Sequence, residues 1–205
     1  MIYERRRLFT AVEKGVSETY QQLEYIESSG TQYIDTGFIA NQDTRIVVDF
    51  QPLEIVASFI FGARTSAASR AYALNIGGSP IQLLSSFGSS GNKAIELLDT
   101  TKRYTVDKDK RVVYLNGIKK ATLTANTFTT QGNINIFACN QAGANGYLPS
   151  KMRLYSCQMY DNGTLIRDFI PCYRKSDKKT GLYDLVNSVF YENNGTGDFI
   201  KGGEV

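Results

Sequence analysis

Residues Lys151 to Phe199 read KMRLYSCQMYDNGTLIRDFIPCYRKSDKKTGLYDLVNSVFYENNGTGDF and carry the clearest secondary-structure signal of the chain. Two apolar runs meet at Asn162-Gly163, and a third run, Gly181 to Leu185, is followed by Val189 to Tyr191. Asn-Gly readily takes the positive φ angles that a tight hairpin turn needs. The stretch therefore predicts consecutive antiparallel strands.

The same pattern recurs through the rest of the chain, where short strand-like runs are separated by clusters of Gly, Asn, Asp and Ser. In Thr44 to Phe50, the side chains of Ile46, Val48 and Phe50 share one face, which is the period-two pattern of a half-buried strand. A second Asn-Gly turn stands at Asn116-Gly117. No long segment has helical periodicity, so the pattern predicts two antiparallel sheets packed face to face.

Two segments resemble the LamG-like, concanavalin A-like jelly-roll domains that are common in phage tail, fibre and head-decoration proteins and in surface proteins of gut bacteria. One is LEYIESSGTQYIDTGF (Leu23 to Phe38), and the other is RLYSCQMYDNGTLIRDFIPCYR (Arg153 to Arg174) with GLYDLVNSVFY (Gly181 to Tyr191) behind it. The resemblance implies an all-β, two-sheet antiparallel jelly-roll sandwich. It leaves function open, because this sandwich hosts lectins, adhesins, structural proteins and glycosidases.

Residues 1–20, MIYERRRLFTAVEKGVSETY, differ in sequence pattern from the rest of the chain, since they are charged and lack a turn signal before Gly15. We predict a short N-terminal arm at 1–20 and one LamG-like domain at 21–205, with a disordered leader as the alternative for the arm. Apolar residues such as Leu8 and Phe9 would let the arm dock on another chain. It is therefore expected to attach the protein to other virion proteins or to sister subunits in a homo-oligomer.

The overall charge excludes two classes of partner. A formal charge of +3, from 23 basic and 20 acidic residues, is too small and too scattered for a nucleic acid or an anionic membrane. No apolar stretch approaches the roughly 18 residues of a membrane span. Residues Met1 to Arg5 carry charge and no apolar signal region, so we expect no secretion signal. A protein that is assembled in the bacterial cytoplasm and released by lysis would have such a sequence.

Catalytic residues are not predicted. Glycosidases of the concanavalin A-like fold place carboxylates as Glu-x-Asp-x-Glu, so that the acid and the nucleophile face one sugar, and this triplet does not occur here. Glu96 and Asp99 are three residues apart, which on a strand sends them to opposite faces. A serine nucleophile needs a base, and the chain has no histidine.

A cofactor is not predicted either. The three cysteines, Cys139, Cys157 and Cys172, lack metal-ligand spacing, and the turn at Asn162-Gly163 would place Cys157 near Asp168, away from Cys172. Asp107 and Asp109 could give calcium two oxygen ligands. The flanking Lys108, Lys110 and Arg111 favour a charged hairpin turn instead, so no metal-ligand set is assigned.

With no catalytic or metal site predicted, the remaining type of function is binding of a glycan. Sugar-binding surfaces combine flat aromatic rings with amides and carboxylates that bond the sugar hydroxyls; the chain has 13 Tyr and 11 Phe but no Trp. We predict that residues 140–147 form a polar loop near the strand of Tyr72. The candidate glycan-binding residues are Tyr72, Asn140, Gln141, Asn145 and Tyr147. A polar connection that only spans the sandwich edge is the alternative.

Three hypotheses on function follow. The first is a non-enzymatic virion structural protein of a tailed phage, in the tail, a fibre or the capsid decoration, whose LamG-like domain contacts host-surface or mucosal glycans. The second is a carbohydrate-binding module of a bacterial cell-surface or secreted protein. The third is a glycoside hydrolase.

Overall fold

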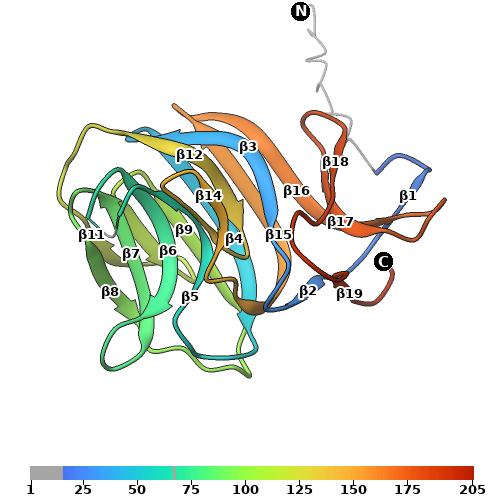
Figure 1. The fold of residues 1–205 in the computed structure, drawn as a ribbon, viewed down its shortest axis with the longest axis horizontal. Coiled ribbons are helices and arrows are strands. Elements are labelled where there is room, and N and C mark those ends of the chain that lie inside the picture. The colour runs from blue at the N-terminus through green and yellow to red at the C-terminus, as the bar shows by residue number, and fades with distance from the viewer. Residues whose placement is uncertain (1–15, 67) are drawn as a thin grey trace, which may run out of the picture.

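The computed structural model describes residues 16–66 and 68–205, which form two β-sheets packed face to face (Figure 1). The first sheet has 11 strands and the second has 8. Over these ranges the chain forms no helix, and hence none that is long and apolar enough to cross a membrane. The predicted all-β jelly-roll sandwich is confirmed.

The first sheet follows the order β11-β10-β9-β4-β15-β16-β17-β18, with β2 beside β15, β19 beside β2, and β1 beside β16. Its strands are β1 (Tyr20–Gln22), β2 (Ile26–Ser29), β4 (Thr44–Pro52), β9 (Tyr104–Asp109), β10 (Val112–Leu115), β11 (Ile118–Thr122), β15 (Lys151–Asp161), β16 (Thr164–Arg174), β17 (Thr180–Asp184), β18 (Val189–Tyr191) and β19 (Ile200–Lys201).

The second sheet follows the order β14-β13-β5-β6-β7-β8, and β12 joins β3 to β5. Its strands are β3 (Ile34–Asn41), β5 (Ser58–Arg64), β6 (Ala71–Gly77), β7 (Gln82–Gly88), β8 (Asn92–Glu96), β12 (Thr129–Ile136), β13 (Cys139–Gln141) and β14 (Ala144–Tyr147). The strands pair antiparallel except for β13 and β5, which run parallel. The order thus brings residues 139–147 beside β5, about 80 residues earlier in the chain.

The core lies between the two sheets and follows the predicted alternation. In β4, Ile46, Val48 and Phe50 are fully buried, while the residues between them are partly exposed. In β6, Tyr72 and Leu74 point into the same core from the second sheet. Burial of these apolar faces stabilises the sandwich by roughly 25 cal/mol for each Å² removed from water.

Both predicted Asn-Gly hairpins are confirmed. Asn162 and Gly163 have φ angles of 46° and 81°, and Asn116 and Gly117 have φ angles of 49° and 77°. Two consecutive positive φ angles match the right-handed twist of the flanking strands. The register of two long strand pairs is therefore set at these turns.

The register of β15 on β16 differs from the prediction by one residue further along the pair. Asp161 faces Thr164 as expected, but a shift between Met159 and Tyr160 brings Cys157 opposite Phe169. An extra residue in one strand of a pair is a β-bulge, which the turn sequence alone does not reveal. Cys157 is a free, buried cysteine, as are Cys139 and Cys172.

The predicted loop at 140–147 is wrong, since these residues belong to a hairpin of β13 and β14. Its turn is Ala142-Gly143, with φ angles of 54° and 89°. Alanine rarely takes a positive φ, so the turn lacks the Asn-Gly signature of the other two. The hairpin places side chains on the two faces of the second sheet instead of in a mobile connection.

The sandwich begins one residue before the predicted boundary at 21. Tyr20 pairs with Arg174 in β1, and its ring lies 4.9 Å from the ring of Tyr183 and 5.0 Å from that of Phe190. Of the predicted arm at 1–20, residues 1–15 lie outside the described residues, so its role in attachment stays a prediction.

Candidate functional site

Tyr72 lies in the sandwich interior, which corrects its prediction as a surface residue. Its side chain is fully buried, and its hydroxyl lies 2.9 Å from the carbonyl oxygen of Thr44 and 2.8 Å from that of Lys108. Burial raises the pKa of Tyr72 well above its usual value. The residue occupies a core-facing position of β6, so it cannot contact a glycan.

Two other predicted residues brace the β13–β14 hairpin. The Nδ2 of Asn140 donates to Oδ1 of Asn145 at 2.7 Å, and its Oδ1 accepts from the backbone N–H of Gly143 at 3.0 Å. Asn140 is buried and therefore structural, whereas Asn145 is exposed at the hairpin.

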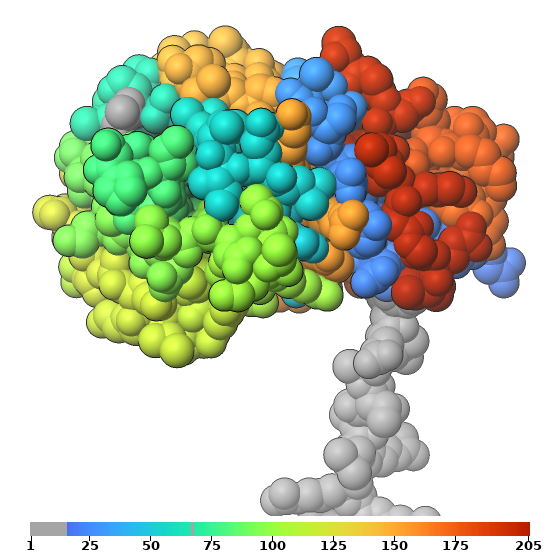
Figure 2. All heavy atoms as spheres, turned by 90° about the horizontal axis from the view of Figure 1, so that it is seen from below, coloured from blue at the N-terminus to red at the C-terminus, as the bar shows by residue number. Residues whose placement is uncertain are grey.

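The remaining two, Gln141 and Tyr147, lie on the outer face of the second sheet beside Arg64. Strand pairing sets Gln141 opposite Arg64 and Tyr147 opposite Cys139. In Figure 2 the golden segment that contains the hairpin lies at the surface beside the cyan β5. We call Phe59, Arg64, Gln141, Asn145 and Tyr147 the Arg64 patch.

The guanidinium of Arg64 is held at the centre of this patch. Its Nε and Nη2 donate to Oε1 of Gln141 at 3.1 and 2.8 Å. Its Cζ lies 4.7 Å from the ring centroid of Phe59 and 5.6 Å from that of Tyr147, within the range of cation–π attraction. Phe59 is buried beneath, while Tyr147 is 38% exposed, so an ordered cation and an accessible ring stand side by side.

The charge of Arg64 has no carboxylate partner among the described residues. Five other arginines do form ion pairs: Arg45, Arg103, Arg153, Arg167 and Arg174. Gln141 is neutral, so it orients the guanidinium without cancelling its charge. The Arg64 patch can therefore offer an acceptor-rich ligand both a cation and a ring.

Next to the patch, a row of small, buried residues crosses the sheet. Register aligns Cys139, Gly62, Ala73 and Ser86 on neighbouring strands. A Cβ at Gly62 would lie 2.7 Å from that of Ala73, so this position requires glycine. Burial raises the pKa of the Cys139 thiol to about 12, so it stays protonated and is a poor nucleophile.

The carboxylates considered as catalytic groups or calcium ligands form ion pairs or hydrogen bonds within the protein. Glu96 forms an ion pair with Lys120, and Asp99 accepts from the backbone N–H and hydroxyl of Thr101. Those hydrogen bonds lower the pKa of Asp99. Asp107 binds Arg45 through both of its oxygens, at 2.9 and 2.7 Å.

Metal-binding clusters are likewise absent from residues 16–66 and 68–205, where no three His, Cys, Asp or Glu side chains come together. The ion pair of Asp107 leaves neither of its oxygens free for calcium. The fit of a calcium ion to Asp107 and Asp109 is therefore poor.

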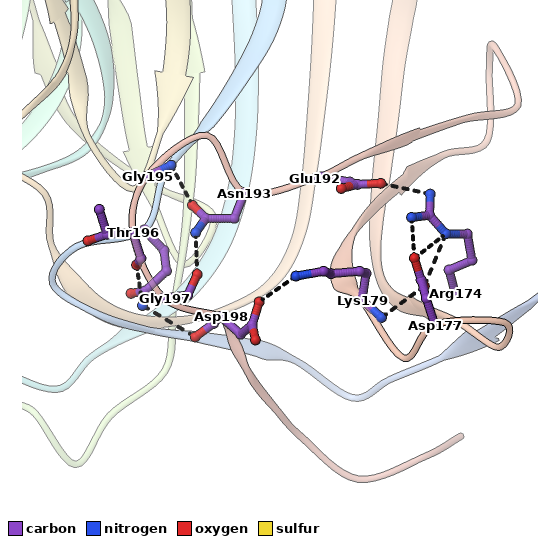
Figure 3. Close-up of polar contacts among 10 residues, drawn as sticks. Arg174, Asp177, Lys179, Glu192, Asn193, Gly195, Thr196, Gly197 and Asp198 are labelled. Carbon is purple, nitrogen blue, oxygen red and sulfur yellow. Dashed lines mark hydrogen bonds and ion pairs between the residues drawn. The ribbon is translucent and has the colours of Figure 1, made fainter.

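A polar corner near the C-terminus provides a contrast to the Arg64 patch (Figure 3). Arg174 bonds Asp177 and Glu192, and Nζ of Lys179 lies 3.2 Å from a carboxylate oxygen of Asp198. Hydrogen bonds to both carboxylates raise the pKa of Arg174 above its usual value. Each of these cations has an anionic partner within the protein.

The loop that lines this corner is also pinned by amide side chains. Asn193 accepts from the N–H of Gly195 at 2.8 Å and donates to the carbonyl oxygen of Gly197 at 2.7 Å (Figure 3). The pocket between loop and strand is small, about 160 Å³. We interpret the corner as a structural brace.

Arg64 and Phe59 were missed by the sequence analysis. Nothing in the sequence around Arg64 marks it as a partner of Gln141, which is 77 residues away. Only the parallel pairing of β5 with β13 brings the two together. No sequence signal short of that pairing would have found this site.

Comparisons with known proteins show similarity of fold. No family model matches the chain, and no curated protein matches it. A native heptameric SAP-like pentraxin from Limulus polyphemus is 12% identical, with a TM-score of 0.52, over 92% of this chain and 97% of that chain. This likeness shows a shared jelly-roll sandwich and no more.

A carbohydrate-binding module, the CBM40 of the IT-sialidase of Ruminococcus gnavus, has a weaker likeness. With bound α2,3-sialyllactose it is 17% identical, with a TM-score of 0.47, and a second structure of the module is 15% identical, with a TM-score of 0.49. Each likeness covers 68% of this chain and 90% of that chain. The function of the sandwich has to be argued from its own surface.

Proposed function

We propose that the protein is a non-catalytic carbohydrate-binding module that holds a glycan on the outer face of its second sheet. The observation that carries this proposal is the Arg64 patch, where a carboxylate-free guanidinium is fixed between two aromatic rings and a glutamine. Of the three hypotheses from the sequence, it favours the second.

The chemistry of the patch suits a sugar. The exposed part of the Tyr147 ring can stack on the apolar C–H face of a pyranose, as aromatic rings do in many binding sites. Arg64 and the amide of Gln141 can donate hydrogen bonds to ring and hydroxyl oxygens, and hydrogen bonds from a charged donor are the stronger kind. Asn145 adds an exposed amide at the rim.

Pre-organisation is a second support. Arg64 already lies against Phe59 and Gln141, so a ligand need not immobilise a long flexible side chain. Ordering one such side chain costs about 0.5–1.5 kcal/mol, which this arrangement avoids on binding.

The test is a glycan array followed by calorimetry on the best ligand. We expect Tyr147→Ala and Arg64→Gln each to weaken binding by about tenfold or more, since each removes an interaction of roughly 1.5 kcal/mol. Tyr114→Ala and Arg111→Gln are matched controls. Tyr114 lies in β10 of the first sheet and Arg111 lies in the turn just before it, and neither has a carboxylate partner among the described residues. Equal binding by all four variants would contradict the proposal.

The absence of catalysis is part of the same proposal. The engaged carboxylates Glu96 and Asp99 support it. Incubation with a broad panel of polysaccharides should release no reducing sugar. Turnover that disappears in Glu96→Gln would instead support the glycoside hydrolase hypothesis.

Display on a virion is a separate proposal, supported by the resemblance to phage domains and by the apolar residues interspersed in 1–20. It includes the homo-oligomer and the contacts with virion proteins, and the bacterial cell surface is its alternative location. Electron microscopy of the source particle should show the protein at fixed stoichiometry. A bacterial surface protein would not copurify with particles.

A further inference from the structure

A second opening lies where the loops meet at one end of the sandwich, and it shares no residue with the Arg64 patch. Its volume is about 610 Å³. We call it the loop-end pocket, and its lining comprises Gln42, Ala68, Ser69, Arg70, Ser89, Asn126, Thr127, Phe128 and Thr129. These residues come from the turns after β3, β5 and β7 and from the segment that leads into β12.

The charge in this pocket is positive and uncompensated. Arg70 is exposed and forms no ion pair with any carboxylate in the described part of the chain, and no Asp or Glu lines the pocket. The backbone before it is tied by hydrogen bonds between the N–H and C=O groups of Ser66 and Ser69, at 3.3 Å in each direction. Arg70 itself has a positive φ of 47°, which is uncommon for a residue with a side chain.

The other lining groups are neutral and hydrogen-bonding. The hydroxyls of Ser69, Thr127 and Thr129 make no hydrogen bond within the described residues, and Oδ1 of Asn126 accepts none. The Nδ2 of Asn126 donates to Oγ of Ser89, which fixes the orientation of the amide. The pocket thus combines one cation with several free donors and acceptors.

One of the lining residues, Phe128, is aromatic. Phe128 is 8% exposed and packs edge-to-face on Phe87, with ring centroids 4.9 Å apart. Its backbone N–H donates to Oε1 of Gln42 at 3.4 Å. These contacts hold Phe128 in place.

We propose that the loop-end pocket binds an anionic sugar, whose sulfate, phosphate or carboxylate group meets Arg70 while its hydroxyls bond Ser69, Asn126 and Thr129. An inorganic anion would occupy only part of a pocket of this volume. A neutral sugar would leave Arg70 without a counter-ion. The volume of about 610 Å³ accommodates a mono- or disaccharide.

The experiment is a titration of the full chain with galactose 6-sulfate, followed by the backbone amide signals of Ser69, Ser89 and Thr127 in NMR spectra. Galactose and sodium sulfate are titrated in parallel. We expect galactose 6-sulfate to shift these signals at a lower concentration than galactose or sodium sulfate does. Arg70→Gln should weaken binding of the sulfated sugar by about tenfold or more, because a charge-assisted hydrogen bond is lost.

Three further variants make the result unambiguous. Arg64→Gln and Arg111→Gln should leave the titration unchanged, which separates this pocket from the Arg64 patch. Thr127→Glu places a carboxylate at an exposed position of the lining and should repel the sulfated sugar without affecting the fold. A thermal melt of each variant checks that it folds.

Several results would overturn the proposal. One is unchanged affinity in both Arg70→Gln and Thr127→Glu. Another is loss of binding in Arg64→Gln alone, which would assign the sulfated sugar to the Arg64 patch. A third is sodium sulfate matching the sugar in affinity and in its pattern of shifts, which would show a site for an inorganic anion only.

Discussion

At the scale of single residues, the least expected feature is a lysine inside the core. Lys108 was predicted in a charged turn, but that turn is formed by Lys110 and Arg111, and Lys108 is fully buried. Its Nζ donates to Oγ of Ser85 at 2.9 Å and lies 4.6 Å from the ring centroid of Tyr72. Burial lowers the pKa of Lys108 to about 7, so its charge is costly to the folded state at neutral and lower pH.

A pH dependence of stability follows from this shift. Because the folded pKa lies below the unfolded value of 10.5, the unfolded chain holds a proton that the folded chain lacks between about pH 7 and 10.5. Stability should therefore rise with pH through this window, by about 2 kcal/mol between pH 7 and 9 from this residue alone. Below pH 7 both states are protonated and the full cost remains.

Lys108→Met tests this directly. Methionine fills a similar volume, and Ser85 keeps its hydrogen bond to the carbonyl oxygen of Ala73. We expect the variant to be more stable at pH 6.5 by about 1–3 kcal/mol and to lose the gain in stability on going to pH 9. Urea unfolding at several pH values measures both effects, with the exposed Lys93→Met as control. The same pH slope in Lys108→Met and wild type would show that another group titrates.

The glycines of the Asn-Gly turns give a second prediction at this scale. Gly163 and Gly117 have positive φ angles, and a Cβ at either position would meet nothing within 4 Å. Valine at either should therefore cost about 1–2 kcal/mol through backbone strain alone. Unchanged melting temperatures in both variants would contradict the turn geometry.

At the scale of elements, the sequence predicted the features that depend on neighbouring residues, namely the Asn-Gly turns and the buried face of a strand. Asn162-Gly163 and Asn116-Gly117 identified two turns, and the alternation in β4 identified the core face, because both depend on neighbouring residues. The parallel pairing of β13 with β5 could not be predicted, since it joins segments about 80 residues apart. The β13–β14 hairpin was missed because its turn, Ala142-Gly143, lacks Asn. The Arg64 patch depends on the parallel pairing, so only its residues in β13 and β14 were found.

The β13–β14 hairpin can be tested through two of its glycines. Gly143 and Gly146 both have positive φ angles, but a Cβ at Gly143 meets nothing, whereas one at Gly146 would lie 2.8 Å from Cε1 of Tyr33. Gly143→Ala should cost about 1 kcal/mol from strain, and Gly146→Ala should cost more because the Tyr33 ring must also shift. Thermal unfolding compares the two.

Glycan binding adds a second readout for this pair. Gly146→Ala should weaken binding by displacing the adjacent Tyr147, while Gly143→Ala, at the tip of the hairpin, should bind almost as the wild type does. If both variants bind normally, the position of Tyr147 is unimportant and the Arg64 patch is not the binding surface.

At the scale of the whole molecule, the two outer faces of the sandwich differ in how they use arginine. On the first sheet, Arg103 bonds Asp49 through two nitrogens, at 2.6 and 2.7 Å, and its Cζ lies 3.7 Å from the ring centroid of Tyr155. That charge is satisfied within the protein. Arg64, Arg70 and, in the turn between β9 and β10, Arg111 form no ion pair within the described residues, but of these three only Arg64 lies against aromatic rings.

The boundary of the folded domain gives the last prediction. The backbone N–H of Lys175 donates to the carbonyl oxygen of Thr19, and Tyr20 packs on the rings of Tyr183 and Phe190. Deleting residues 1–15 should leave the melting temperature nearly unchanged, because the sandwich strands begin at Tyr20. Deleting residues 1–20 should lower it by roughly 2–6 °C, since the loss of two aromatic contacts and of a strand residue costs about 1–2 kcal/mol.

Differential scanning calorimetry and light scattering on the two truncated proteins decide both halves of this prediction. If residues 1–15 attach the protein to sister subunits, the shorter deletion yields a monomer that melts like the full chain. Lower stability of that monomer would mean that residues 1–15 contribute to the sandwich. Unchanged assembly of a chain that lacks them would show that oligomerisation, where it occurs, uses a surface of the sandwich itself.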